Sequence, residues 1–110
     1  MVVYILNTLI TPIDFDKVSE AIVKFRKISI EEAKSILSNG FVSAIGHEGT
    51  ANLLSRILEI QIPSNRITVF MKSGDKGVHF FLKQRLPEGV VLDEQQLSKL
   101  QFWLVLSEVE

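Results

Sequence analysis

Residues 45–50 hold the most informative chemical group in the chain, an imidazole between two glycines. The segment reads Ile45-Gly46-His47-Glu48-Gly49-Thr50 and lies where a short strand pattern passes into a helix pattern. The first N–H groups of a helix lack internal partners and carry partial positive charge, so they suit a phosphate. Gly46 and Gly49 would let a ligand approach the backbone, and His47 could donate a proton to a leaving oxygen. Taken alone, a Gly-His pair is more typical of an ordinary helix start, so this alternative stays open.

Two further segments carry charged side chains beside predicted strand ends. In Gln84-Arg85-Leu86-Pro87-Glu88-Gly89, Arg85 could clamp a phosphate through its planar guanidinium, and Glu88 could orient Arg85 or His47. In Asn65-Arg66, the arginine could contact an anion or be a charge at a sheet edge. Each segment by itself also fits a solvated turn. Ligands of α/β sheets gather at strand ends, so the convergence of three such segments predicts one site.

Apolar patterns predict the elements that would carry these segments. Predicted strands cover residues 1–7, 21–28, 41–45, 66–72, 78–84 and 101–106, and predicted helices cover residues 30–38, 50–58 and 93–99. The first strand ends at Asn7 and leads into a loop over residues 8–16, where Pro12 cannot donate a backbone hydrogen bond. Residues 14–20 could alternatively begin a helix. Ser29 with Glu32 three residues later forms a capping-box pattern that begins the first helix.

This order of elements predicts one α/β domain over residues 1–110. We expect a mixed sheet of five or six strands with about three helices mainly on one face. Residues 66–72 and 78–84, joined by a turn rich in Gly and Asp, predict a hairpin. An uncovered sheet face would expose Phe and Leu side chains, which predicts a homodimer. Trp103 and most of the Phe residues are expected in the core or at the dimer contact, although one aromatic ring could stack on adenine, and His79 is expected at the sheet surface.

Composition excludes several classes of function. The chain has 110 residues, 12 Lys plus Arg against 13 Asp plus Glu and a net charge of −1, which excludes a generally basic protein that coats duplex nucleic acid. It has no Cys, which excludes a disulfide scaffold and a thiolate metal site and fits a reducing cytoplasm. No apolar run approaches the ~20 residues that span a bilayer, so no membrane partner is expected. Nucleotide-binding fingerprints and metal-ligand spacings are absent from the sequence, so neither a cofactor nor a metal site is expected.

The same segments resemble the viral type III anti-CRISPR ring nucleases and their host-encoded relatives, ring nuclease 2. The resemblance covers nearly the whole chain and is carried by Leu6-Asn7, by Ala44-Ile45-Gly46-His47 with Thr50, by Asn65-Arg66, and by Gln84-Arg85-Leu86 with Glu88-Gly89. The combination is more specific than any single piece. It implies a homodimeric, metal-independent phosphodiesterase that cleaves cyclic tetra-adenylate, the second messenger of type III CRISPR systems.

The resemblance also implies roles for individual residues. His47, Arg85 and Glu88 map onto the catalytic residues of the family. The residues expected to bind the ligand are Asn7, Thr8, Gly46, Gly49, Thr50, Asn65, Arg66 and Gln84. Two other classes of function remain open: a non-catalytic protein that binds or sequesters the cyclic nucleotide, and a structural or regulatory dimer that binds no cyclic oligoadenylate.

Overall fold

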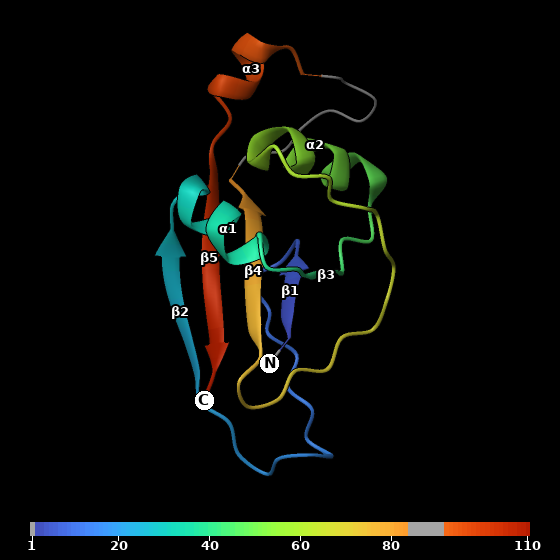
Figure 1. The fold of residues 1–110 in the computed structure, drawn as a ribbon, viewed down its shortest axis with the longest axis vertical. Helices are drawn as coiled ribbons and strands as arrows, with labels where there is room; N and C mark the ends of the chain where they lie inside the picture. The colour runs from blue at the N-terminus through green and yellow to red at the C-terminus, as the bar shows by residue number, and fades with distance from the viewer. Residues whose placement is uncertain (1, 84–91) are drawn as a thin grey trace.

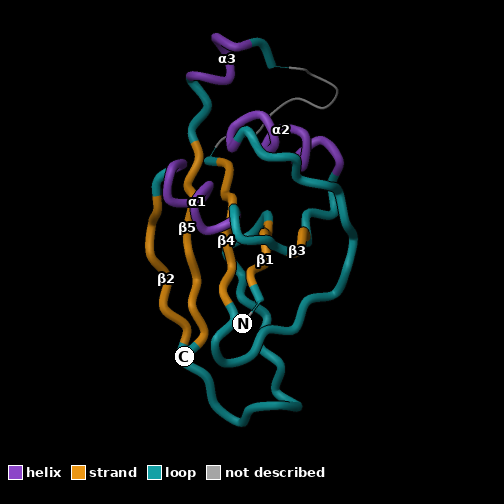
Figure 2. The backbone as a smooth tube through the Cα atoms, in the orientation of Figure 1, coloured by secondary structure: helices purple, strands orange, loops and turns teal. Residues whose placement is uncertain are grey.

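The computed structural model of the chain describes residues 2–83 and 92–110 and contains a mixed sheet flanked by helices (Figures 1 and 2). The elements are β1 (Val3–Leu6), β2 (Val23–Ile28), α1 (Ile30–Leu37), β3 (Val42–Ser43), α2 (Glu48–Leu58), β4 (Lys76–Leu82), α3 (Glu94–Ser98) and β5 (Phe102–Val109). Over these residues the sheet has five strands in the order β2-β5-β4-β1-β3. β1 is parallel to β3 and β4, whereas β5 is antiparallel to β2 and β4. The predicted α/β class and mixed sheet are confirmed.

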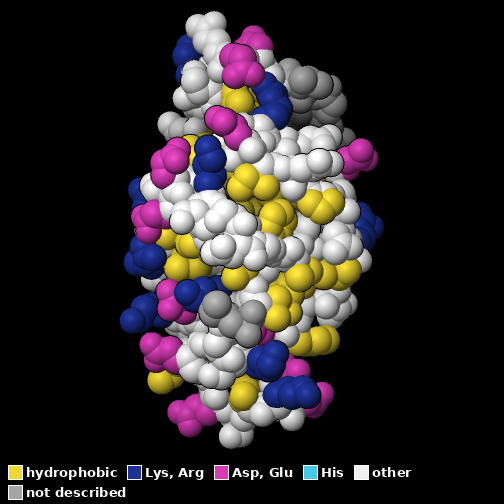
Figure 3. Space-filling model, viewed as in Figure 1, with side chains coloured by type: hydrophobic (Ala, Val, Ile, Leu, Met, Phe, Trp, Pro, Cys, Tyr) yellow, Lys and Arg dark blue, Asp and Glu magenta, His cyan; other side chains and the backbone are white. Residues whose placement is uncertain are grey.

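α1 and α2 cover one face of the sheet, and α3 lies beyond its end, at the top of Figure 1. The core between them combines buried side chains of both helices with every second residue of the strands, including Ala33, Leu37, Leu54, Val78 and Leu104. Removing these apolar side chains from water is the main favourable contribution to folding. Partly buried apolar residues surround this core, and Figure 3 shows hydrophobic side chains at the surface over the middle of the helical face.

Helix α1 begins where the sequence predicts it. The Ser29 hydroxyl accepts a hydrogen bond from the Glu32 N–H at 3.1 Å, which satisfies one of the N–H groups that a helix start leaves free. The Glu32 carboxylate binds the Arg26 guanidinium of β2 at 2.8 Å. This pair is exposed, and it lowers the pKa of Glu32 and raises that of Arg26. α1 is therefore joined to the edge strand that precedes it.

The predicted hairpin between residues 66–72 and 78–84 is wrong. Residues 66–70 form no strand, and Met71 pairs with the loop after β1: its N–H donates to the Pro12 carbonyl at 2.8 Å, and the Asp14 N–H donates to the Met71 carbonyl at 2.8 Å. β4 lies between β1 and β5, so both of its edges are already occupied. The alternating sequence pattern identified an extended segment but not its neighbour, because strand pairing is set by contacts distant in sequence.

The second face of the sheet is only partly covered. Loop residues cover the part of this face near the end of β5, where Val69 and Met71 pack with Val109. The other part leaves Phe25, Phe81 and Trp103 exposed, and we call these three residues the aromatic face. The Phe81 and Trp103 rings stack at 5.3 Å, with the Lys83 ammonium 5.3 Å from the indole centroid.

Most of the Phe residues expected in the core or at a dimer contact do not lie in the core. Four of the seven are exposed (Phe15, Phe25, Phe70 and Phe81), whereas Phe80 is buried. Phe80 and Phe81 differ because successive side chains of β4 point to opposite faces of the sheet, and only one of these faces carries the helices. The contact of these exposed rings with a second copy of the chain stays a prediction.

Candidate functional site

The candidate site lies at the end of the sheet where the parallel strands β1 and β3 terminate. Ile5 is paired with Ser43, and beyond this pair the Ala44 N–H donates to the Ile5 carbonyl at 2.9 Å. The residues that follow the two strands therefore leave the sheet side by side. Asn7 and Thr8 follow β1, and the segment ending in Gly46 and His47 follows β3. This arrangement brings the first loop and the start of α2 to one sheet end.

A hydrogen-bond network fixes the segment between β3 and α2. The Asn65 N–H donates to the Ile45 carbonyl at 2.8 Å, and its side-chain amide nitrogen donates to the Ser43 carbonyl at 2.9 Å. The buried Ser43 hydroxyl donates to the Pro63 carbonyl at 2.6 Å and accepts from the Ile45 N–H at 3.3 Å. Asn65 thus holds the backbone beside the site through its amide nitrogen. Sequence reasoning missed Ser43, whose only local signal is a hydroxyl within an apolar strand pattern.

Arg66 lies against the backbone just before α2. Its Nε donates to the Gly46 carbonyl at 3.3 Å, and a Cβ added at residue 46 would lie 3.3 Å from the Arg66 Cγ. A glycine at this position therefore permits the close approach of the arginine stem. Arg66 is exposed, and its terminal guanidinium nitrogens bind none of the residues that the structure describes. These nitrogens are available to an anion.

His47 is the N-cap residue of α2. Its backbone is extended, with φ −113° and ψ 123°, and its carbonyl accepts the Ala51 N–H at 3.0 Å. The imidazole is exposed and makes no capping hydrogen bond, which is unlike the Ser, Thr, Asp and Asn side chains usual at this position. The first N–H groups of α2 are therefore not capped by this side chain, which belongs to the residue directly before them in the chain. Among the residues of this first turn, Gly49 has open space at its Cα, and Thr50 is half-buried.

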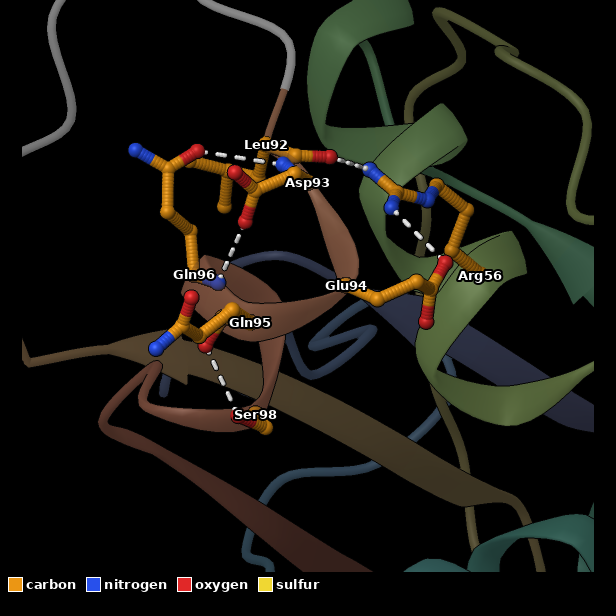
Figure 4. Close-up of polar contacts among 7 residues, drawn as sticks. All are labelled: Arg56, Leu92, Asp93, Glu94, Gln95, Gln96 and Ser98. Atoms are coloured by element: carbon orange, nitrogen blue, oxygen red, sulfur yellow. Dashed lines mark hydrogen bonds and ion pairs between the residues drawn. The ribbon is translucent and has the colours of Figure 1, made fainter.

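The last turn of α2 is joined to the start of α3 and to the residue that precedes its cap (Figure 4). Arg56 donates to the Leu92 carbonyl at 2.6 Å and pairs with the Glu94 carboxylate at 3.3 Å. Asp93 and Gln96 form a complete capping box at the start of α3. Gln84, Arg85 and Glu88 lie outside the described residues, so their predicted roles stay predictions.

His79 is not a sheet-surface residue as predicted. The side chain is fully buried, with Nδ1 2.6 Å from the Thr8 carbonyl oxygen and Nε2 2.7 Å from the Ser107 hydroxyl. Burial lowers the pKa of His79 below its ordinary value, although the hydrogen bond to Thr8 acts in the opposite direction. The alternation of β4 predicts which face the side chain occupies, but loop coverage of that face depends on tertiary structure.

Within residues 2–83 and 92–110, no group of three or more His, Cys, Asp or Glu side chains is placed to hold a metal ion. Over the same residues, no helix combines the length and apolar character needed to cross a membrane.

A family model described as STIV B116-like matches residues 3–104. The chain belongs to the STIV B116-like family. Uncharacterized protein 26 of Sulfolobus islandicus filamentous virus is 41% identical over 96% of the chain and 90% of that protein. Uncharacterized protein ORF117 of Acidianus two-tailed virus is 44% identical over 84% of the chain and 79% of its own length. The bacterial protein YddF of Bacillus subtilis is 34% identical over 80% of the chain and 84% of its own length.

A solved structure of a STIV B116-like protein has the same fold. B116 of Sulfolobus turreted icosahedral virus superimposes with a TM-score of 0.80, covering 98% of the chain and 99% of B116 at 23% identity. Together with the family match, this similarity confirms the predicted relationship to the viral ring nuclease family. The relationship establishes the family and the fold.

Proposed function

We propose that this chain is a metal-independent ring nuclease that works as a homodimer in the cytoplasm of the host cell. Its substrate would be cyclic tetra-adenylate, and its products linear di-adenylates with 2′,3′-cyclic phosphate ends, so that it modulates type III CRISPR antiviral signalling. The observation that carries the proposal is the start of α2, where His47 is the exposed N-cap residue and its imidazole does not cap the first N–H groups of the helix. Arg66 and the turn after β1 lie at the same end of the sheet.

The chemistry needs a positioned ribonucleotide and a proton donor. A ribose 2′-hydroxyl, held in line, loses its proton to water and attacks the adjacent phosphorus; the bond from phosphorus to the 5′-oxygen breaks, leaving a 2′,3′-cyclic phosphate. Orientation of this kind lowers the barrier by several kcal/mol. His47 would donate a proton to the departing 5′-oxygen, an effect worth ~10²–10⁴ in rate. Arg85 would neutralise the charge on the phosphorane, and Glu88 would hold Arg85 or favour the protonated form of His47.

A homodimer matches the symmetry of this substrate. The ring carries four phosphates and has two-fold symmetry, and two copies of the chain would place two α2 starts and two Arg66 side chains around one cavity. A protein with a net charge of −1 must concentrate positive charge locally to hold such a polyanion. Helix N-termini and a few arginines supply this charge without a basic surface.

The proposal is tested by incubating the protein with labelled cyclic tetra-adenylate, with and without excess EDTA, and separating the nucleotides after denaturation. We expect linear di-adenylates in both conditions. His47→Ala should lower turnover by at least about 100-fold, the contribution of a general acid, and should still bind the ring. Asn52→Ala, an exposed change on the same helix, is the matched control and should turn over normally.

Three outcomes would contradict parts of the scheme. Recovery of intact ring from a wild-type protein that binds it would identify a sponge. A strict requirement for metal would overturn the metal-independent mechanism. Normal turnover by His47→Ala would remove this residue from catalysis.

A further inference from the structure

The strongest feature outside the site is the buried imidazole of His79, at the centre of the sheet. His79 lies on β4 directly opposite Leu6, the last residue of β1. The side chain has no exposed surface, and both ring nitrogens have partners, the Thr8 carbonyl at 2.6 Å and the Ser107 hydroxyl at 2.7 Å. A polar side chain buried to this degree on a central strand is costly unless its hydrogen bonds are satisfied. His79 therefore connects the turn after β1 to β5.

The partners determine the tautomer of His79. A carbonyl oxygen can only accept, so Nδ1 must carry the hydrogen that is donated to Thr8. Nε2 then accepts from the Ser107 O–H. The neutral imidazole satisfies both partners with one donor and one acceptor. The bond to Thr8 thus has a defined direction, from the side chain to the loop backbone.

The surrounding sheet leaves room for this arrangement. Gly77 lies two residues before His79 on the same face of β4, opposite Ser107 of β5. A Cβ added at Gly77 would lie 2.8 Å from the His79 Nε2 and 2.8 Å from the Ser107 Oγ. Any side chain at residue 77 would displace the pair. The hydrogen bond between His79 and Ser107 therefore depends on a glycine that the sequence supplies.

The consequence for the site concerns Asn7 and Thr8. The ladder with β4 holds Leu6, and the imidazole holds the Thr8 carbonyl, so the backbone on both sides of Asn7 is fixed. The Thr8 side chain is exposed while its carbonyl is bound to the interior. Asn7 and Thr8 follow β1 at the sheet end where Gly46 and His47 follow β3.

We propose that His79 is a positioning residue for the ligand: through its Nδ1–H it fixes the backbone of Asn7 and Thr8 in the conformation that binds the cyclic nucleotide. This inference rests on the proposed function. His79 itself touches no substrate. It acts through the Thr8 carbonyl, and Ser107 acts through His79.

The test uses substitutions that separate the two ring nitrogens. The side-chain nitrogen of Asn is as many bonds from Cα as Nδ1, so His79→Asn keeps a donor for Thr8. The nitrogen of Gln is as many bonds from Cα as Nε2, so His79→Gln places its amide toward Ser107 and loses the donor to Thr8. Val78→Ala, a buried change on the opposite face of the same strand, is the matched control for general loss of stability.

We expect the KM for cyclic tetra-adenylate to rise when the hydrogen bond from residue 79 to the Thr8 carbonyl is lost, and not when the fold is merely less stable. His79→Gln should raise KM about tenfold with kcat changed by less than about threefold, as expected for a lost hydrogen bond that orients binding residues. His79→Asn and Val78→Ala should keep KM within about threefold of wild type. Amide hydrogen exchange of residues 7–10 should be faster in His79→Gln and close to wild type in Val78→Ala. Urea unfolding of each variant measures the fraction of the protein that is folded under the assay conditions, so that a loss of folded protein is not mistaken for a change in KM.

The outcomes distinguish this inference from the proposed function. A wild-type protein that neither binds nor cleaves the ring overturns both. A wild-type protein that cleaves the ring, with equal KM values for His79→Gln and His79→Asn, overturns only the positioning role. If His79→Gln does not fold, Ser107→Ala replaces it: faster exchange at residues 7–10 with a raised KM supports the role, and unchanged values overturn it.

Discussion

At the scale of single residues, the burial of His79 makes the stability of the fold depend on pH. The pKa of His79 is lowered from its ordinary value of 6.5, mainly by desolvation. The unfolded chain then binds more protons at this residue than the folded chain as pH falls through about 6.5, so the free energy of unfolding decreases toward acid. Stability should therefore be complete above about pH 7 and fall below it, with a slope of at most about 1.4 kcal/mol per pH unit from this group.

Urea unfolding of wild type and His79→Asn between about pH 7.5 and pH 5.5 measures this contribution, because Asn does not titrate. We expect a shallower decrease in the variant. His47 is present in both proteins and therefore does not cause a difference between their slopes. The Glu32 carboxylate titrates at lower pH, because its pKa is lowered by Arg26. Equal slopes for the two proteins would show that His79 has the same proton affinity in the folded and unfolded chains.

At the scale of elements, a substitution in the first turn of α2 should change the stability of the fold and the affinity for the ligand in opposite directions. Gly49 lies in the first turn of this helix, a Cβ added there would meet nothing within 4 Å, and its φ is not positive. Gly49→Ala should therefore raise the free energy of unfolding by about 0.5 kcal/mol, because Ala restricts the unfolded chain. The same methyl group would obstruct a phosphate that approaches the N–H groups, so affinity for the ring should fall roughly tenfold, about the effect of one lost hydrogen bond.

Urea unfolding and equilibrium titration with cyclic tetra-adenylate measure these opposite effects. Asn52→Ala, one turn further along α2, should leave affinity unchanged. Unchanged affinity in Gly49→Ala would place the ligand away from this turn.

Local signals made most elements of this chain predictable. The apolar run of β1, the Ser29 cap of α1 and the apolar periodicity of α2 each specify an element from a few neighbouring residues. The candidate site residues Gly46 and His47 can likewise be picked out from neighbouring residues, because they lie in one local motif. The sequence predicts the wrong partner for segment 66–72, because its pairing with the loop after β1 joins residues more than fifty positions apart.

The polar network at the centre of the sheet could not be predicted for a related reason. The hydrogen bond between His79 and Ser107 spans 28 residues, and that between His79 and Thr8 spans 71. Neither His79 nor Ser107 has a local sequence signal of burial, since a His or Ser in a strand pattern is equally compatible with a solvated face. Strand order decides that they meet, and strand order is set by packing of the whole chain.

At the scale of the whole molecule, the aromatic face gives the predicted homodimer a testable location. Phe25, Phe81 and Trp103 lie on the face of the sheet opposite the core that α1 and α2 cover, and between 37% and 49% of each residue is exposed. Exposed apolar patches of this kind mark association surfaces. If a second copy covers this face, a charge placed there would be desolvated without a partner and would prevent association. If the face is free, the same charge would remain hydrated and have little effect.

Light scattering on wild type and Trp103→Glu distinguishes these cases. We expect the wild type at twice the chain mass of 12.4 kDa and Trp103→Glu at the mass of a single chain. Ring cleavage should be lost with the dimer, because the proposed cavity takes catalytic residues from both copies. Phe15→Glu, at a more exposed aromatic position in the loop between β1 and β2, is the control and should stay dimeric. A dimeric Trp103→Glu protein would place the interface on another surface, and a monomeric wild type that still cleaves the ring would show that one copy forms a complete site.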